Sequence, residues 1–191
     1  PTMAAPELAQ TLLIQYISDL SKTKGRTSLA LWQEKIYKIG MDIAAMDGYY
    51  KEYQKSLIRL CDMTSDKSME ILKQEFSQGV STHPAHIRNN LDFVRNEWLE
   101  KIGSALSNHK AVIIKGVSGQ GKTALCHRFL LDNYPEQLVF CVRHIQSTRE
   151  AENLVSALQG IVKHARDIIL YIDVNTGEAN WTLLLQELQA R

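Results

Sequence analysis

The sequence predicts an α/β protein in which an α-helical N-terminal half precedes a half built on a parallel β-sheet with helices on both faces. Two observations lead to this prediction. In four stretches between residues 12 and 106, apolar residues recur every three or four positions, which is the spacing of a buried helix face. Beyond residue 110, short continuous apolar runs alternate with helical stretches, an alternation typical of βαβ units.

The composition excludes several classes of protein. With 191 residues, 45% of them hydrophobic, the chain can bury a core, which excludes a disordered protein. Lysine and arginine total 22 against 21 aspartates and glutamates, so no positive excess indicates binding of nucleic acid or anionic membrane. The chain has neither a long apolar span nor a leader pattern at its start, which predicts a soluble, cytoplasmic protein. The three cysteines fit neither a disulfide framework nor a zinc site, so we expect reduced thiols.

The N-terminal half has the pattern of several helices. We expect a first helix over residues 12–20, followed by an a/d heptad pattern over residues 29–60. Gly48 lies inside this pattern, so the segment is one long helix or two helices joined near the glycine, which costs about 1 kcal/mol in a helix interior. We interpret the apolar positions as the packed face of a helical bundle; a coiled-coil oligomerisation arm is the alternative.

Two further helices are expected, over residues 66–76 and 90–106. The polar, proline-containing stretch between them interrupts the pattern and is the expected linker. Its two histidines, His83 and His86, are interpreted as loop polarity rather than a metal site. The predicted domains are residues 1–80, an all-α effector, adaptor or interaction domain; residues 81–89, the linker; and residues 90–191, the sheet domain.

Three apolar runs predict the strands of the sheet, at residues 111–114, 138–142 and 168–172. Helical stretches at about residues 122–133 and 149–164 lie between them. Strands that alternate with helices in this way pair in parallel.

A phosphate-binding motif follows the first of these runs. Residues 116–123 satisfy G-x-x-x-x-G-K-[ST], the Walker A motif, and precede a predicted helix. Glycines let successive backbone N–H groups and the helix N-terminus converge on phosphate oxygens. Lys122 would reach the β- and γ-phosphates, and the Thr123 hydroxyl would bind Mg²⁺. The remaining positions provide glycine turns and backbone amides: Gly116, Val117, Ser118, Gly119, Gln120 and Gly121.

Asp173 directly follows the third run, where the magnesium-binding aspartate of a Walker B strand lies. Val174 occupies the next position, at which many P-loop ATPases have an acid that polarises the attacking water. Asn175 and Glu178 are nearby and are interpreted as loop and helix-cap polarity. The sequence therefore predicts binding of ATP or ADP with Mg²⁺ more firmly than hydrolysis; in a slow ATPase the catalytic residues would be Lys122 and Asp173.

On these residues, the C-terminal half resembles the STAND class of P-loop ATPases, relatives of the AAA+ proteins that include NACHT and NB-ARC-like signalling proteins. The resemblance covers residues 90–191 and is carried by residues 92–95 with Leu99, by residues 112–125 and by residues 169–173. It implies the following further nucleotide-binding residues: Phe93, Val94 and Arg95 around the adenine, and Ala124 beside the phosphates.

The same resemblance implies a truncated P-loop NTPase domain. In this class, a strand with a sensor residue separates the P-loop strand from the Walker B strand, and the chain has no such strand after Asp173. Because a sheet that lacks an internal strand leaves backbone groups unpaired, we expect the protein to continue beyond Arg191.

Proteins of this class act as signal-transduction switches. The resemblance therefore implies that nucleotide state controls oligomerisation and is coupled to an N-terminal effector or adaptor, with prokaryotic antiviral defence or regulated cell death as the expected setting. Residues 1–80 contain no nuclease, protease or NAD-cleaving constellation, so they are expected to bind protein partners.

Three other functions stay open. A helicase-loader or transposition ATPase of the AAA+ type would act on nucleic acid, although the near-zero net charge argues against it. A small-molecule or nucleotide kinase would need a lid and an acceptor pocket, for which the sequence has no signal. A nucleotide-binding scaffold without hydrolysis is favoured by Val174.

Overall fold

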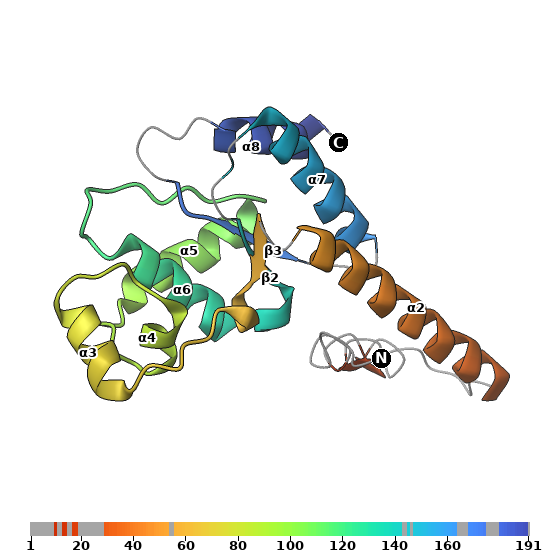
Figure 1. The fold of residues 1–191 in the computed structure, drawn as a ribbon, viewed down its shortest axis with the longest axis horizontal. Helices are drawn as coiled ribbons and strands as arrows, with labels where there is room; N and C mark the ends of the chain where they lie inside the picture. Colours follow the sequence, from red (N-terminus) through yellow and green to blue (C-terminus); the bar gives the residue numbers. More distant parts are fainter. Residues whose placement is uncertain are drawn as a thin grey trace. The chain divides into compact units, whose positions relative to one another are not determined.

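The computed structural model describes residues 10, 13–14, 17–18, 29–53, 56–142, 145, 147–163, 168–174 and 180–190 (Figure 1). The chain forms two compact units, Pro1–Arg59 with Gln137–Arg191, and Leu60–Glu136. The first contains α2 (Leu29–Tyr53), β1 (Leu57–Arg59), β2 (Val139–Val142), α7 (Thr148–Val162), β3 (Ile169–Ile172) and α8 (Asn180–Ala190). The second contains η1 (Leu60–Asp62), α3 (Met69–Ser77), α4 (Pro84–Arg88), α5 (Asn96–Asn108) and α6 (Lys122–Asn133). A short turn of 3₁₀-helix, η2 (Glu136–Leu138), spans the boundary.

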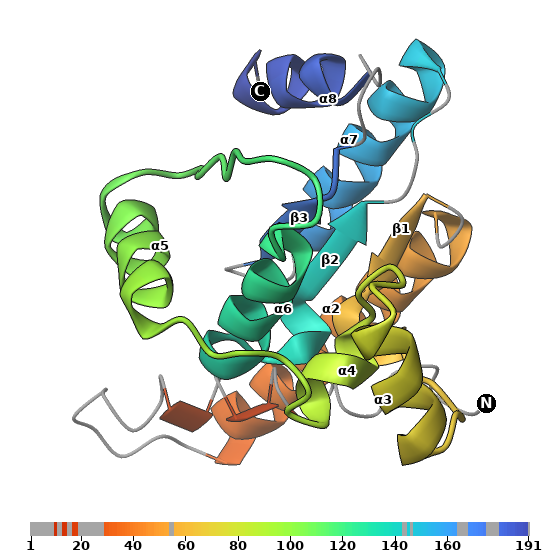
Figure 2. The same ribbon diagram turned by 90° about the vertical axis from the view of Figure 1, so that its left-hand side faces the viewer.

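A small three-stranded sheet organises the first unit, with β2 between β1 and β3 (Figure 2). β2 pairs with β3 in parallel, Val139 opposite Ile169, and with β1 in antiparallel fashion, Val142 opposite Leu57. Every residue of β2 is buried, as its continuous apolar run predicts. The predicted strands at 138–142 and 168–172 and their parallel pairing are confirmed, and with them the α/β class.

Helix α7 connects the two parallel strands and provides more of this unit's core than any other element. It begins at Ser147, whose hydroxyl accepts the Glu150 N–H at 3.2 Å and caps the helix. Its apolar side chains then recur at helical spacing and pack on the sheet, and both α2 and α8 lie against it. The core consists of Leu57, Leu138, Phe140, Val142, Ile145, Ala151, Leu154, Val155, Leu158, Ile161 and Leu184.

The long apolar pattern of the N-terminal half is only partly helical. α2 is one helix that continues through Gly48, which decides between the two alternatives, and it packs along α7 with Ile39 against the core. The pattern predicts that the helix continues through Leu57 and Leu60, and this is wrong. Residues 57–59 instead form β1, because their backbone finds a partner in β2. Heptad spacing does not reveal such a partner from a distant part of the chain.

The domain boundaries stay a prediction, although the structure bears on their content. Because β1 lies within residues 1–80, this range is not purely helical, and the two units divide the chain at other positions. The helix expected at 12–20 lies largely outside the described residues; its described positions, 13–14 and 17–18, are helical and exposed.

The second unit contains the predicted helices 66–76 and 122–133 as α3 and α6, and α6 packs on α5 through Ile102, Leu125 and Phe129. Within the expected linker 81–89, however, the chain forms α4, whose first four residues are buried. In the sequence, the proline was the sign that a helix starts here. Pro84 occupies the first helical position, where a missing N–H costs nothing.

The two histidines of this stretch are helix caps rather than loop polarity. The His83 Nδ1 accepts the Ala85 N–H at 3.2 Å, and the His86 Nδ1 accepts the His83 N–H at 3.1 Å. Burial lowers the pKa of His83. In the described part of the chain, no three His, Cys, Asp or Glu side chains gather in a way that could hold a metal ion.

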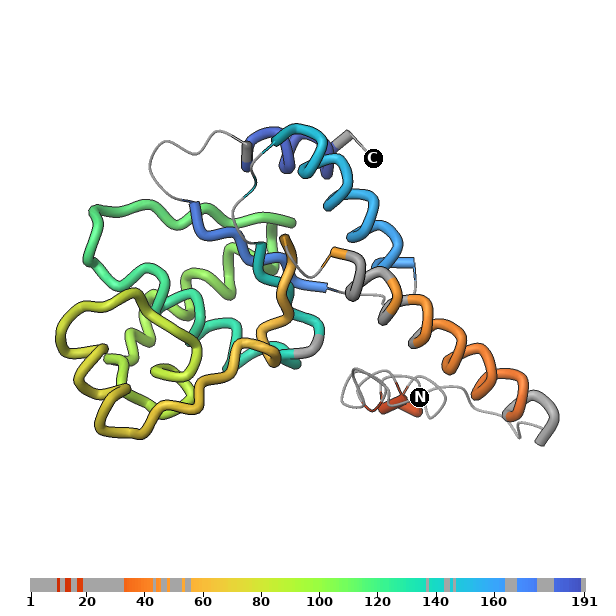
Figure 3. Tube along the Cα trace, in the orientation of Figure 1, coloured from red at the N-terminus to blue at the C-terminus, as the bar shows by residue number. Residues whose placement is uncertain are grey.

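The most consequential difference concerns residues 111–114, predicted as a strand buried on both faces. In the structure they form no strand. Figure 3 shows the path of the chain here as a green tube. Ile114 packs against the α5–α6 core, whereas Ile113 is 65% exposed. An apolar run becomes a strand only when its backbone groups find a neighbouring strand, and no strand in the described residues pairs with this one.

The three cysteines are free thiols, as expected. Burial raises the pKa of Cys141 to about 12, so its thiol stays protonated near neutral pH. None of the helices that the structure describes has the length and apolar character needed to cross a bilayer.

Replacing Gly48 by alanine tests the continuity of α2. A Cβ at this position meets nothing within 4 Å, so Gly48→Ala should raise the free energy of unfolding by about 0.5–1 kcal/mol. Gly79→Ala is the contrasting variant: the φ of 72° at Gly79 is strained for alanine, so this variant should destabilise the protein. Urea unfolding followed by far-UV circular dichroism measures both. Destabilisation by Gly48→Ala would mean that α2 is broken at this glycine.

Candidate phosphate-binding site

The glycine loop, residues 116–121, leads directly into α6, whose first residue is Lys122. Gly119 and Gly121 have φ angles of 79° and 70°, in the left-handed region where only glycine lies at little cost. Gly121 is the N-cap of α6. The predicted context of the motif is therefore present on the helix side, and the strand on its other side is not formed.

The Lys122 ammonium closes the glycine loop on itself. Its Nζ donates to the carbonyl oxygens of Gly116 and Val117, both at 2.9 Å. Residues 116–120 are all exposed, so these two carbonyl oxygens can be rehydrated if the ammonium moves to another acceptor. The lysine predicted to bind phosphate thus lies inside the loop that would surround the phosphate.

Gln120 contributes a side chain to the loop as well as an amide. Its Oε1 accepts the Val117 N–H at 3.2 Å, and a Cβ on Gly116 would lie only 2.7 Å from that oxygen. The sequence predicted only a backbone role for Gln120. The glycine at position 116 was the sequence feature that could have indicated this side-chain role, because it leaves room for the Gln120 carboxamide.

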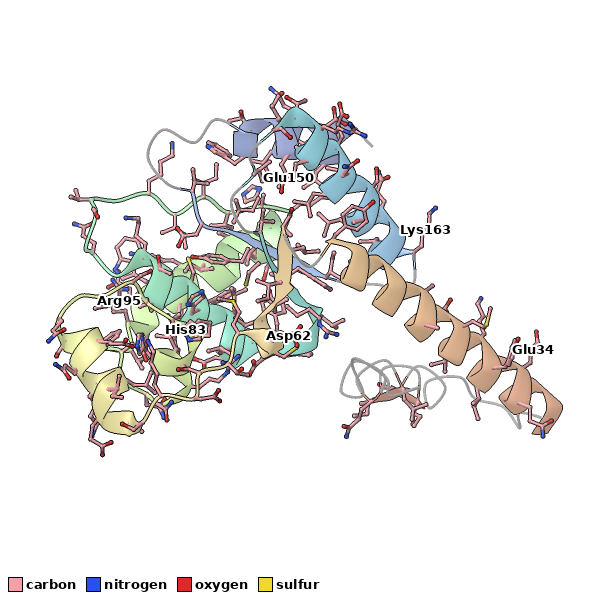
Figure 4. The ribbon with its side chains drawn as sticks, in the orientation of Figure 1. Glu34, Asp62, His83, Arg95, Glu150 and Lys163 are labelled. Carbon is pink, nitrogen blue, oxygen red and sulfur yellow. The ribbon has the colours of Figure 1, made fainter. Side chains whose placement is uncertain are left out.

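Arg95 contacts the loop from outside. Its Nη1 donates to the Gln120 carbonyl at 3.0 Å and its Nη2 to the Gly121 carbonyl at 2.5 Å (Figure 4, where Arg95 is labelled). The structure therefore brings Arg95 to the motif, although Gln120 and Gly121 lie 25 and 26 residues after Arg95 in the sequence. The adjacent Phe93 and Val94 are 85% and 45% exposed, so this pair presents apolar surface to solvent next to the arginine.

The first turn of α6 completes the group. The first N–H groups of any helix lack partners within the helix, and the helix dipole makes this end favourable for anions. Thr123 is half-buried there and Ala124 is buried. Together with the cations of Lys122 and Arg95, these groups form a surface suited to a polyanion.

Sequence reasoning missed Arg128, which fixes the segment before Arg95. Its side chain is only 10% exposed, and its Nη2 donates to the Ile87 carbonyl at 2.9 Å and to the Asn90 Oδ1 at 3.1 Å. Its Nε donates to the Asp92 Oδ2 at 3.1 Å, and Nη2 pairs with the other Asp92 oxygen. The hydrogen bonds that Arg128 donates to the Asp92 carboxylate raise the pKa of Arg128.

This network explains why α5 begins at Asn96, six residues later than predicted. Asn90 has a φ of 53°, and both its side chain and that of Asp92 are held by Arg128. Residues 90–95 therefore lie outside the helix despite their helical spacing. The sequence signal for a buried arginine was its place between Leu125 and Phe129, the two α6 residues that pack against α5.

Asp173 belongs to the other unit and lies directly after β3, as predicted, where it is exposed. Val174, the next residue, is 42% exposed. The two polar residues considered as substitutes for a catalytic acid, Asn175 and Glu178, lie outside the described residues.

One protein-family model matches the part of the chain that contains the glycine loop and Asp173. It is described as novel STAND NTPase 3, and the match covers residues 93–181. The matched range starts at Phe93 and contains the glycine loop, α6 and Asp173. Over this range, which is less than half of the chain, the sequence is similar to the STAND NTPases. No curated protein and no solved structure matches the chain.

Removing the Arg128 guanidinium should destabilise the second unit. Arg128→Met leaves the Asp92 carboxylate, 4% exposed, without its cation, and breaking a buried pair in this way costs about 3–5 kcal/mol. The matched control is Lys101→Met, which breaks the exposed pair with Glu97 and should leave the urea midpoint unchanged. Urea unfolding measures both variants. Equal midpoints for the two would show that the Arg128 network carries no stability.

Proposed function

We propose that this chain is the nucleotide-binding part of a signal-transduction switch that binds ATP or ADP together with Mg²⁺. One observation carries the proposal. The glycine loop lies at the N-terminus of α6 with two cations, Lys122 and Arg95, on its backbone, inside a segment that matches a STAND NTPase family. Converging amides and cations at a helix N-terminus are the chemistry that recognises phosphate.

The phosphates would bind to the glycine loop and the first turn of α6. Lys122 would exchange its two carbonyl acceptors for β- and γ-phosphate oxygens, which is favourable because a charged acceptor forms the stronger hydrogen bond. The proposed phosphate-side residues are Gly116, Val117, Ser118, Gly119, Gln120, Gly121, Lys122, Thr123 and Ala124. Residues 116–120 are exposed, so an anion can reach the loop from solvent.

Mg²⁺ is the proposed metal, with the Thr123 hydroxyl and the Asp173 carboxylate as its protein ligands. Both are oxygen donors, which Mg²⁺ prefers, and Asp173 is exposed after its strand. When bound, the ion would neutralise charge on the phosphates. The adenine would lie against Phe93 and Val94, whose exposed apolar surface would be covered by a base.

Hydrolysis is proposed to be slow. Lys122 and Asp173 are the proposed catalytic residues, and they would stabilise charge on the transferred phosphoryl group. Val174 carries no group that orients water. Binding and release of nucleotide, rather than rapid turnover, would then set the state of the switch.

The N-terminal region is proposed to connect this switch to protein partners and to oligomerisation, in a cytoplasmic setting such as prokaryotic antiviral defence or regulated cell death. In support, α2 carries large apolar side chains that are more than half exposed, at Ile36, Tyr37 and Met41. Apolar groups gathered on a helix surface suit contact with another protein.

Nucleotide binding by Lys122→Ala tests the proposal directly. Loss of a charge-assisted contact should weaken ATP and ADP binding about 10- to 100-fold, as measured by titration calorimetry with Mg²⁺ present. Lys110→Ala, an exposed lysine of the same unit, serves as control and should bind like the unaltered protein. Equal affinities for both variants would contradict a phosphate-binding role for the motif.

The metal ligands are tested by the affinity for ATP with Mg²⁺ relative to the affinity in EDTA. Thr123→Val and Asp173→Asn each remove one oxygen ligand, so this ratio should fall several-fold while binding in EDTA stays similar. Glu152→Gln, an exposed acid on α7, should leave the ratio unchanged. If Asp173→Asn keeps the full ratio, Asp173 does not bind the metal.

A further inference from the structure

We infer that Arg95 is a positioning residue of the glycine loop: it holds the peptide between Gln120 and Gly121 in the orientation that presents the Gly121 N–H to phosphate. The inference rests on the proposed function and assigns Arg95 to the phosphate side of the site. It derives from the two hydrogen bonds of the guanidinium to the loop backbone.

The orientation of this peptide needs an external support. In a trans peptide the carbonyl and the N–H point in opposite directions, so fixing one fixes the other. The Gly121 carbonyl already accepts the Leu125 N–H at 3.0 Å, the first bond of α6. The Gln120 carbonyl takes no part in the helix, and Gly121, with a φ of 70°, allows the peptide before it to turn at little cost. The Arg95 Nη1 bond to that carbonyl therefore selects one orientation.

Arg95 is itself held in place from both sides. Its own carbonyl accepts the N–H groups of Trp98 and Leu99, at 3.0 and 3.1 Å, and so starts α5. Three residues earlier, Asp92 is fixed by Arg128 of α6. Residues 92–95 are thus anchored twice on the same helix, at Arg128 in its middle and at Gly121 at its N-cap.

The close approach adds to the reason for a glycine at position 121, which its φ of 70° already favours. A Cβ there would lie 3.3 Å from the Arg95 Nη2, tighter than an ordinary contact. A guanidinium at a helix N-terminus opposes the helix dipole. Without a ligand, a cation in this place lowers the stability of the helix. A bound anion would compensate the unfavourable charge.

A base-free ligand separates this role from contact with the adenine. Inorganic tripolyphosphate and ATP, each with Mg²⁺, are titrated calorimetrically into the full chain and into Arg95→Lys. Lysine keeps the charge but has no planar fork to hold both carbonyls. We expect Arg95→Lys to lower the affinity for both ligands by the same factor, about tenfold. Lys115→Met is the charge control: it removes a cation next to Gly116, and its effect should vanish at high salt, whereas that of Arg95→Lys persists.

The outcomes are distinguishable. If Arg95→Lys weakens the binding of ATP and leaves that of tripolyphosphate unchanged, Arg95 contacts the base and the inference is wrong. If it binds both ligands like the unaltered protein while Lys122→Ala does not, the inference fails and the proposed function stands. If the unaltered chain binds neither ligand, both fail.

An NMR measurement reports on the peptide itself without a ligand. The chain has ten glycines, so glycine-specific ¹⁵N labelling gives a spectrum in which the Gly121 amide can be followed. We expect Arg95→Lys to broaden or split the Gly121 resonance, because the peptide then samples two orientations, and to leave Gly79 and Gly103 unchanged. A single, unshifted Gly121 resonance would overturn the inference.

Discussion

The second unit depends on the burial of one cation, the guanidinium of Arg128. A buried arginine must have acceptors for its donors, since an unpaired charge away from water is strongly unfavourable. These acceptors come from the end of α4, from the turn at Asn90 and from Asp92. Their convergence on α6 fixes the path of residues 87–92, and that path determines where α5 starts and where Arg95 reaches the glycine loop.

A second constraint is that residues 111–114 pair with no strand in the part of the chain that the structure describes. A segment that is unpaired, packed through Ile114 and exposed at Ile113 does not hold a loop rigidly from its N-terminal side. The glycine loop is instead held by the side chains of Lys122, Gln120 and Arg95. Lys122 and Arg95 donate to loop carbonyls, and Gln120 accepts the Val117 N–H. Its conformation therefore depends on polar contacts that an anion can replace or strengthen.

What the sequence could predict follows from how local each feature is. The bounds of α6, the buried run of β2 and the placement of Asp173 after β3 depend on residues close in sequence, and these predictions are confirmed. β1, the absent strand at 111–114 and the Arg128 network depend on partners that are distant in sequence. A periodicity cannot name those partners. For the same reason, Arg95 was expected beside the adenine on the strength of a motif, whereas its hydrogen bonds to the loop are visible only in the structure.

The charges around the glycine loop bear on how readily it would bind an anion. In the part of the chain that the structure describes, Lys122 and Arg95 donate to backbone carbonyls and to no carboxylate. A carbonyl carries only a partial negative charge, so it compensates a cation less well than a carboxylate does. An incoming polyphosphate therefore binds Lys122 without displacing an acid, while Arg95 keeps its bonds to the loop carbonyls. The negative charge also relieves the repulsion between these two cations and the positive end of α6. Binding should thus stabilise the N-terminus of α6 and, through Arg95 and Arg128, the start of α5. Since a ligand stabilises whatever state binds it, the proposed nucleotide would in this way stabilise the folded second unit.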